Sequence, residues 1–371
     1  MPSGAVVVLG GGGAGLALAG RLALDGHRVV LWEAPSGREP GALRGECPQL
    51  RFGGAGGEAV ATLAAATSDP FEAMAAGDVL LSCASPRERT GFTDLLLPLV
   101  EPRHTLVLMP GSLGSLAHAK WLRDRGRGAG GLPTLVESDT PPLVGHALGP
   151  DRIQLSAIVA NPGFGVFPAC RTVAAMVMLR ELFPGAQAYA HVVAAALAAV
   201  VPFLRAPASL MNAGALARTG AAFSLFEDGF TPGVARVAEA LDAERLALAA
   251  ALGLDLPAAA EALCAWGLGP RGDLWAAVNG SFALTRTPDS ETTPADRLAG
   301  DVDYCLRPWV ELADQLDVPA PLCRSLVELY DVATGPGRRQ TGWSLDDLGI
   351  AGMTAAALGR FLDTGNDEPG A

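Results

Sequence analysis

The first pattern with chemical meaning is a run of small residues near the N-terminus. Residues 10–15 read G-G-G-G-A-G and satisfy G-x-G-x-x-G directly after the apolar run Val6–Leu9. In such a motif the first glycine permits a tight turn, the second lets a diphosphate approach the backbone, and the third lets helix and strand pack closely. The following helix offers free N–H groups and the positive end of its dipole to phosphate oxygens. We therefore expect a dinucleotide diphosphate to be held by Gly10, Gly12, Gly13, Ala14 and Gly15.

A carboxylate lies at the sequence position that usually contacts the cofactor's ribose. Glu33 lies 18 residues after Gly15, at the end of a second apolar run, Arg28–Trp32. Its carboxylate would accept hydrogen bonds from ribose hydroxyls and repel a 2′-phosphate, which favours NAD over NADP. Arg38 follows five residues later and would act in the opposite sense, so NADP stays open. The simpler alternative is that Glu33 is an ordinary surface residue.

Elements with two different periodicities must position these residues. Short β-branched runs alternate with Ala/Leu-rich helical segments through about residue 165, which predicts a doubly wound parallel sheet. Beyond Val173, apolar residues recur almost only at helical spacing. We predict an α/β protein in which a Rossmann-type doubly wound parallel sheet is followed by an all-helical C-terminal domain. The predicted boundaries are 1–168 for the dinucleotide-binding domain and 169–371 for the helical substrate and catalytic domain.

Composition excludes several classes of protein. The chain has 371 residues, of which 50% are hydrophobic and 18% charged, which argues against an intrinsically disordered chain. Its net charge of −12 would repel phosphate backbones, so no nucleic acid partner is expected. The six cysteines form no C-x-x-C pair, which fits a reducing cytosol and no metal site. The apolar run Val192–Leu204 is short and contains Pro202, so we expect a cytoplasmic protein with no membrane partner.

The whole sequence resembles the NAD(P)-dependent opine dehydrogenases, the octopine and nopaline dehydrogenase relatives. The resemblance rests on TSDPFEAMAAGDVLLSCASP (67–86), LVLMPGSLGSL (106–116), FEDGFTPGVARVAEALDAERLALAAALGL (226–254), DVDYCLRPWVELADQLDVPAP (301–321) and GWSLDDLGIAGMT (342–354), besides the glycine-rich start. It implies a Rossmann domain joined to a helical domain. The implied reaction condenses an amino acid or related amine with a 2-oxo acid, through an imine that hydride reduces.

The resemblance also implies catalytic residues. The family uses a histidine proton donor oriented by an aspartate, and Asp301 in DVDYCLRP matches that aspartate. Asp301 is alternatively a helix N-cap. Arg297 matches a family arginine that holds the substrate carboxylate, and Tyr304, beside Asp301, is a further substrate-binding candidate with a phenol donor.

The family histidine itself is missing from the matching stretch. The family pattern is N-x-N-P-x-x-H-P, and in SLMNAGALARTG (209–220) Asn212 matches the first asparagine while the histidine position falls on Arg218. Arginine stays protonated near neutral pH, so Arg218 would polarise a carbonyl or hold a carboxylate and would not donate a proton. His146 is a weak candidate for a replacement donor, and His191 fits better as a structural residue.

These observations lead to one expected function and two rivals. We expect an NAD(P)H-dependent oxidoreductase of the opine dehydrogenase type, acting on small molecules, with self-association as a homodimer left open. The first rival is a ketone or hydroxy-acid dehydrogenase that forms no imine. The second is a dinucleotide-binding protein without catalytic activity.

Overall fold

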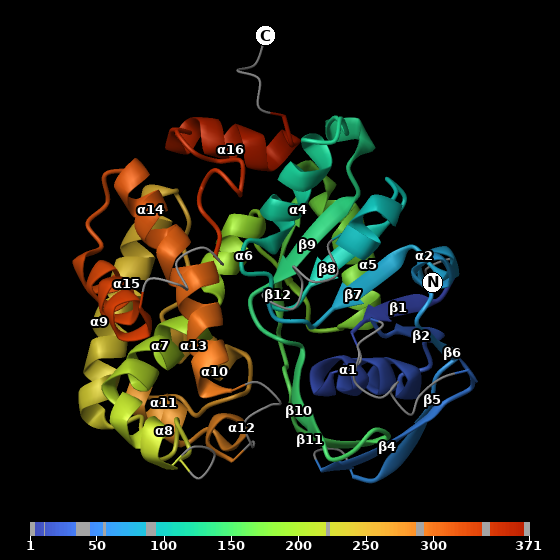
Figure 1. The fold of residues 1–371 in the computed structure, drawn as a ribbon, viewed down its shortest axis with the longest axis horizontal. Helices are drawn as coiled ribbons and strands as arrows, with labels where there is room; N and C mark the ends of the chain where they lie inside the picture. Colours follow the sequence, from blue (N-terminus) through green and yellow to red (C-terminus); the bar gives the residue numbers. More distant parts are fainter. Residues whose placement is uncertain are drawn as a thin grey trace.

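The chain folds into a sheet-containing half and a helical half that lie side by side (Figure 1). The computed structural model describes residues 4–10, 12–34, 45–54, 57–86, 94–219, 223–286, 293–335 and 342–366. Arg38 and Gly11, which belong to the predicted nucleotide site, lie outside these residues.

The larger sheet has nine strands in the order β13-β12-β9-β8-β7-β1-β2-β6-β3. Six central strands, from β9 to β6, run parallel, whereas β12 pairs antiparallel with β9 and β3 pairs antiparallel with β6. The strands are β1 (Val6–Leu9), β2 (Val29–Trp32), β3 (Gly45–Glu46), β6 (Ala65–Thr67), β7 (Val79–Ser82), β8 (Thr105–Leu108), β9 (Thr134–Ser138), β12 (Gly163–Phe167) and β13 (Gln187–Ala188).

The centre of this sheet is a topological switch point. Val6 of β1 pairs with Val29 of β2 on one side and with Val79 of β7 on the other. The chain leaves β1 toward β2 and returns through β6 to β7, so the connections diverge here. Ligands of doubly wound sheets bind at the carboxyl ends of the strands at such a point. The predicted fold class is confirmed.

Alternation along the strands divides the core into two layers. Val6 and Val8 face α1 (Gly13–Leu24) and α5 (Thr172–Leu182), whereas Val7 and Leu9 face α2 (Pro70–Ala76) and α4 (Gly114–Arg123). All four side chains are buried, as the apolar run at the N-terminus predicts for a parallel strand covered on both faces.

A second sheet of four strands lies against α1 and was not predicted. Its order is β10-β11-β4-β5, formed by β4 (Gln49–Gly54), β5 (Ala59–Thr62), β10 (Leu143–Ala147) and β11 (Arg152–Ile158). The segment before residue 165, which the predicted alternation assigned to one parallel sheet, therefore contributes β10 and β11 to this separate sheet. Only Leu50 and Phe52 of β4 face the core, a period-2 signal too short to read from sequence.

The helical half begins where the sheet ends. Its helices are α6 (Val192–Ala198), α7 (Val201–Met211), α8 (Ala213–Thr219), α9 (Pro232–Ala251), α10 (Ala259–Ala265), α11 (Leu274–Asn279), α12 (Phe282–Thr285), α13 (Pro294–Asp301), α14 (Arg307–Gln315), α15 (Pro321–Thr334) and α16 (Ala355–Thr364), with a π-helical turn, η5 (Val302–Leu306), between α13 and α14.

The two halves share one hydrophobic core. The largest buried cluster contains residues of α2 and α4 together with residues of α6, α9, α14 and α16. Phe167 of β12 stacks at a tilt on Phe361 of α16, with ring centroids 5.2 Å apart. The main sheet also continues past the predicted boundary at residue 168, because β13 pairs with β12.

One segment of the core has the composition of a membrane-crossing helix. Residues 192–211 have a mean hydropathy of 1.7 over their most apolar window, but 89% of that window is buried inside the protein. The helix breaks between α6 and α7, just before Pro202. This burial is typical of the core helices of a folded domain.

Candidate active site

The glycine-rich turn joins β1 to α1 at the carboxyl edge of the sheet. Gly10 has a φ of +109°, a conformation that disfavours other residues, and its N–H donates to the carbonyl of Trp32 at 2.9 Å. A Cβ on Gly15 would lie 1.9 Å from the carbonyl oxygen of Gly10. Gly15 is therefore required for the close approach of helix and turn, as the motif predicts.

The same turn has open space where a ligand would approach. A Cβ on Gly10 or on Gly12, the N-cap of α1, would meet no atom within 4 Å. No acidic residue stands in the first turn of α1. An uncovered backbone at a helix N-terminus without nearby negative charge fits a diphosphate group.

Glu33 directly follows β2, the strand next to β1. Its backbone N–H donates to the carbonyl of Thr67 at 3.0 Å, which extends the β2–β6 pairing by one residue. Glu33 thus follows β2 at the same edge of the sheet as the glycine turn. This is the arrangement in which its carboxylate would contact a ribose.

In the helical half, the predicted carboxylate Asp301 pairs with an arginine that the sequence analysis did not single out. Arg205 of α7 donates from Nε to Oδ2 and from Nη2 to Oδ1 of Asp301, both at 2.6 Å. The Asp301 side chain is 3% exposed, and that of Arg205 is 27% exposed. Asp301 is the last residue of α13. Its side chain does not form the capping hydrogen bond that a helix N-cap would make. The two-fold contact fixes the plane of the guanidinium.

The structure does not bring Arg218 to Asp301. Arg218 lies near the end of α8 with an exposed side chain, and both oxygens of Asp301 are engaged by Arg205. Asn212 ends α7 and donates from Nδ2 to the carbonyls of Ala208 and Gly229 at 2.8 and 3.0 Å, which is a structural role.

The sequence held a signal for Arg205 that was overlooked. In the family pattern the donor stands three residues after a proline, and Pro202-Phe-Leu-Arg205 has that spacing. The alignment on Asn212 instead placed the donor at Arg218, thirteen residues downstream, in a stretch where the proline is absent. The ion pair between Arg205 and Asp301 shows that the alignment on Pro202, and not the one on Asn212, places a polar group beside the carboxylate.

The other two predicted substrate residues lie on the segment around Asp301. Arg297 is half-buried on α13, four residues before Asp301 and therefore on the same side of the helix. Tyr304 is 2% exposed within the π-helical turn, with its ring edge-on to Trp343 at 5.1 Å. Such π-helical turns are rare in proteins overall, but those that occur are often found at functional sites.

Two buried carboxylates stand at the end of β9, at the same edge of the sheet. Glu137 accepts hydrogen bonds from the backbone N–H groups of Leu113 and Ser115 at 3.0 and 2.8 Å, and so caps the start of α4. Asp139 accepts from Gly163 N at 2.9 Å and, from side chains, Tyr189 at 2.9 Å and Trp266 at 3.2 Å. Burial raises the pKa of Asp139 to about 7, and these three donors oppose that rise.

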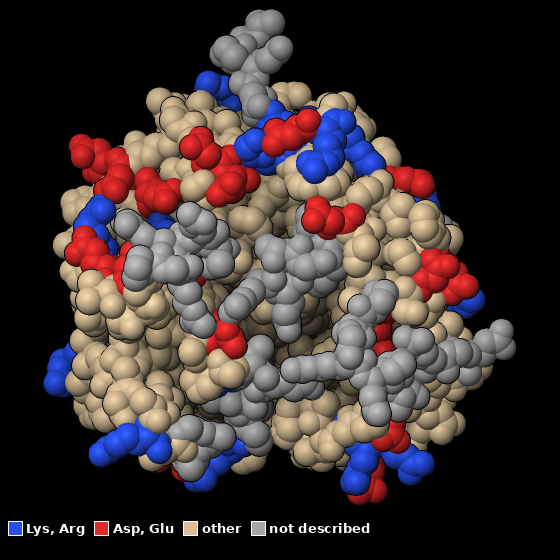
Figure 2. Space-filling model, viewed as in Figure 1, with Lys and Arg blue, Asp and Glu red and all other residues tan. Residues whose placement is uncertain are grey.

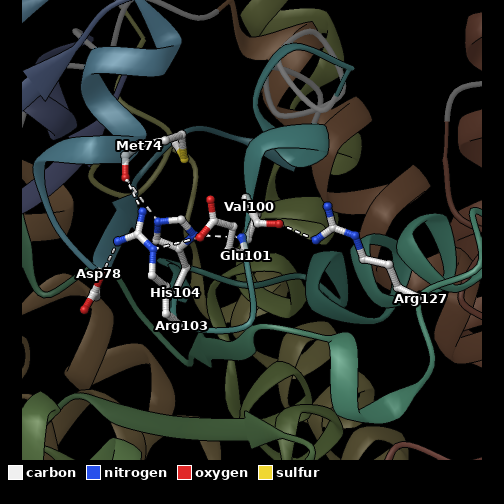
Figure 3. Close-up of polar contacts among 7 residues, drawn as sticks. All are labelled: Met74, Asp78, Val100, Glu101, Arg103, His104 and Arg127. Atoms are coloured by element: carbon white, nitrogen blue, oxygen red, sulfur yellow. Dashed lines mark hydrogen bonds and ion pairs between the residues drawn. The ribbon is translucent and has the colours of Figure 1, made fainter.

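Two of the histidines are committed to structure. His104 is fully buried at the opposite, amino edge of the sheet, where its Nδ1 accepts from Glu101 N at 2.8 Å and its Nε2 donates to Met74 O at 3.2 Å (Figure 3). Burial lowers its pKa. His191 caps α6 through Nδ1, and burial lowers its pKa to about 4. Neither is placed to donate a proton in the site.

One group of charged side chains lies along the upper rim of the molecule. Figure 2 shows blue and red side chains along the upper rim, over α4 and α16, and a hollow between the two halves. A pocket of about 460 Å³ at the rim is lined by residues that include Lys120, Arg123 and Arg127, at the C-terminal end of α4. It lies at the opposite end of α4 from the Glu137 cap, so it does not belong to the candidate active site.

The fold defines a two-part protein in which a Rossmann-type sheet with a glycine-rich turn is combined with a helical half. Residues 188–334 match the family model described as NAD/NADP octopine/nopaline dehydrogenase, alpha-helical domain. A curated opine dehydrogenase of Arthrobacter sp. (strain 1C) is 28% identical over 95% of this chain and 96% of its own length.

Solved structures have the same fold. Octopine dehydrogenase with NADH and agmatine has a TM-score of 0.74 at 15% identity, and with NADH and pyruvate 0.73 at 16%, covering 100% of both chains. Yersinopine dehydrogenase with NADP+ has a TM-score of 0.65 at 14% identity and covers 97% of both chains. The predicted resemblance to the NAD(P)-dependent opine dehydrogenases is confirmed by the family-model match over residues 188–334 and by the curated relative. The predicted cofactor, NAD with NADP left open, agrees with the family description.

Proposed function

We infer that the protein is an NAD(P)H-dependent oxidoreductase that condenses an amine, such as an amino acid, with a 2-oxo acid by reduction of an imine. The observation that carries this function is the glycine turn, where Gly10 and Gly12 leave the backbone open and Gly15 permits the close turn. The helical half of opine dehydrogenase type supports the reaction class.

Each part of the cofactor has a matching group in the chain. The backbone of the glycine turn and the first turn of α1 would hold the diphosphate, and Glu33 would accept hydrogen bonds from ribose hydroxyls. Bound NAD(P)H would supply hydride. The same carboxylate would disfavour the 2′-phosphate of NADPH, so we expect NADH to be preferred.

Arg205 would bind the anionic partner. A planar guanidinium held in one orientation by Asp301 suits two parallel hydrogen bonds to the carboxylate of a 2-oxo acid. Asp301 is a positioning residue, because its two oxygens contact the guanidinium. Because arginine stays protonated near neutral pH, Arg205 would not serve as the proton donor.

Ketone reduction without an imine is a second candidate, and Arg205 is the observation that favours it. A fixed cation stabilises the negative charge that develops on a ketone oxygen during reduction, whereas a protonated imine is itself positive. In this reading the guanidinium would contact the reacting oxygen, and the product would be a hydroxy acid.

One assay separates the two candidates. Purified protein is incubated with NADH and a 2-oxo acid, with and without amino acids, and the products are identified by mass spectrometry. The proposal predicts NADH oxidation that requires the amine and yields an N-(carboxyalkyl)amino acid. Amine-independent formation of a hydroxy acid would establish the second candidate, and cofactor binding without any turnover would exclude both.

A substitution tests the role of Arg205. R205K keeps the charge but loses the planar fork, so we expect kcat/KM for the 2-oxo acid to fall by about 30-fold or more while NADH affinity stays unchanged. D301N should cause a smaller loss through the same parameter, because it releases the guanidinium from its orientation. R218K is the matched control, and a loss there equal to that of R205K would return the role to Arg218.

A further inference from the structure

The helix that ends at Asp301 continues directly into the π-helical turn η5. A π-helical turn holds more residues than an α-helical turn, so side chains before and after it point in directions that a continuous α-helix would not give them. All five residues of η5 are buried, and the turn contacts both α7 and α15. The direction of the Asp301 side chain therefore depends on how η5 is held.

Two buried carboxylates join this segment to those two helices. Asp301 accepts two hydrogen bonds from Arg205 of α7, whereas Asp303, two residues later, accepts one from the hydroxyl of Tyr330 of α15 at 3.2 Å. Both carboxylates are buried, where a charge is tolerated only when it is paired and hydrogen-bonded. Each carboxylate thus ties the segment to a different helix.

Arg307, the first residue of α14, compensates the charge of Asp303. Its Nη2 donates to Oδ1 of Asp303 at 3.3 Å and to Oδ1 of Asp331 at 2.6 Å, and its Nη1 donates to Oδ2 of Asp331 at 3.2 Å. The two-donor contact with Asp331 of α15 fixes the guanidinium beside Asp303. The side chain of Asp303 is therefore held to α15 by a hydroxyl and by a fixed cation.

The backbone of Asp303 is held as well. Its carbonyl accepts from Trp343 N at 3.2 Å, and a Cβ on Gly342 would lie 2.1 Å from the same oxygen. The ring of Trp343 in turn packs edge-on against Tyr304, the next residue of the turn. Asp303 is thus the residue of η5 at which contacts from α14, from α15 and from the segment after residue 342 meet.

We propose that Asp303 is a positioning residue, whose contacts with Tyr330 and Arg307 hold η5 so that the Asp301 carboxylate is directed at Arg205. Asp303 would act on the substrate only through that ion pair. This inference rests on the proposed function, in which Arg205 binds the carboxylate of the 2-oxo acid. It assigns a role to the π-helical turn, which places two carboxylates of one segment against two helices.

Steady-state kinetics of Asp303→Asn test this role. We expect KM for the 2-oxo acid to rise about fivefold or more, with a smaller change in kcat and an unchanged NADH affinity, because a displaced guanidinium binds the carboxylate less well. Tyr330→Phe removes one donor to Asp303 and keeps the ring, so it should change the same parameter less. Glu244→Gln is the matched control, because Glu244 accepts from the N–H groups of Leu322 and Cys323 and so joins the start of α15 to α9. It should lower Tm and leave KM unchanged.

A double-mutant cycle shows whether Asp303 acts through Asp301. In protein that carries Asp301→Asn, the further change to Asp303→Asn should raise KM little, so the two fold-changes should not multiply. Fold-changes that multiply would overturn the proposal. A lowered Tm of Asp303→Asn with an unchanged KM would also overturn it, by making Asp303 purely structural. If Asp303→Asn does not fold, Tyr330→Phe takes its place in the cycle.

Calorimetry with oxamate, a non-reactive analogue of a 2-oxo acid, keeps this test independent of turnover. Protein saturated with NADH should bind oxamate, and Asp303→Asn should weaken that binding by the same factor as it raises KM. If the unaltered protein bound oxamate but oxidised no NADH with any 2-oxo acid, with or without an amine, the proposed function would fail. The oxamate affinities of the variants would then support or overturn the role of Asp303 by themselves. Absence of oxamate binding by the unaltered protein would overturn the role of Arg205 and this proposal with it.

Discussion

At the scale of single residues, the chemistry of the site depends on which charges are fixed and which can titrate. Arg205 and Asp301 form an ion pair, and because arginine stays protonated near neutral pH, Arg205 would bind and orient a substrate and would not donate a proton. Glu33, in the sheet-containing half, would act on the ribose of the cofactor. These roles are separable by substitution.

Glu33→Ser should change the cofactor preference. Loss of the carboxylate removes hydrogen bonds to the ribose and the repulsion of a 2′-phosphate, so we expect NADH to bind about tenfold more weakly and NADPH more tightly. Fluorescence titration of the two reduced cofactors measures both changes. Glu33→Gln, which removes the charge but keeps polar atoms, should improve NADPH binding with a smaller loss for NADH. An unchanged ratio for both variants would exclude Glu33 from cofactor selection.

At the scale of elements, the geometry of the candidate nucleotide site depends on how closely α1 approaches β1. The approach depends on Gly15, whereas the open space in front of the helix depends on Gly12. We therefore expect Gly15 to serve folding and Gly12 to serve binding.

Paired alanine substitutions test this division. Gly15→Ala places a methyl group 1.9 Å from the Gly10 carbonyl and should lower the free energy of unfolding by about 1–3 kcal/mol or more. Gly12→Ala meets no atom within 4 Å and should cost less than about 1 kcal/mol, yet weaken NADH binding by obstructing the diphosphate. Urea denaturation and cofactor titration give the two quantities. Equal effects of both variants on stability would contradict the division.

At the scale of the whole molecule, the two halves are joined by a shared core and by one buried carboxylate. Asp139 follows β9 and bonds Tyr189, which follows β13, and Trp266, which follows α10 in the helical half. The backbone adds a further link, because Ala160 N donates to the carbonyl of Trp266 at 3.0 Å.

Asp139 should make the stability of the protein depend on pH. Its pKa is raised by burial from the ordinary value of 3.8 to about 7, so the folded state holds the proton more tightly than the unfolded chain. Stability relative to Asp139→Asn is therefore greatest below about pH 4, falls as pH rises to about 7 and is level above it, by a few kcal/mol in all. Urea denaturation of both proteins between pH 5 and 8 measures this difference. A difference that does not vary with pH would show that Asp139 keeps an ordinary pKa.

Much of the fold was predictable because it is encoded in short segments. Local sequence patterns predict the structure of the β-branched run Val6–Leu9, of the glycines after it and of the helical segments beyond residue 173. The helical spacing predicted beyond Val173 corresponds to long helices such as α9 and α15. The second sheet was missed because its strands are short and because β4 and β11, which pair with each other, are about a hundred residues apart.

The sequence by itself determined the glycine turn and the division into sheet and helices, and it indicated Asp301 as a candidate site residue. Only the tertiary structure decided that Arg205, 96 residues away, is the partner of Asp301, and that Tyr330 contacts Asp303. The physical reason is that hydrogen-bonding geometry and side-chain spacing specify an element within a few residues. Contacts between distant residues are fixed by how the elements pack around a common core.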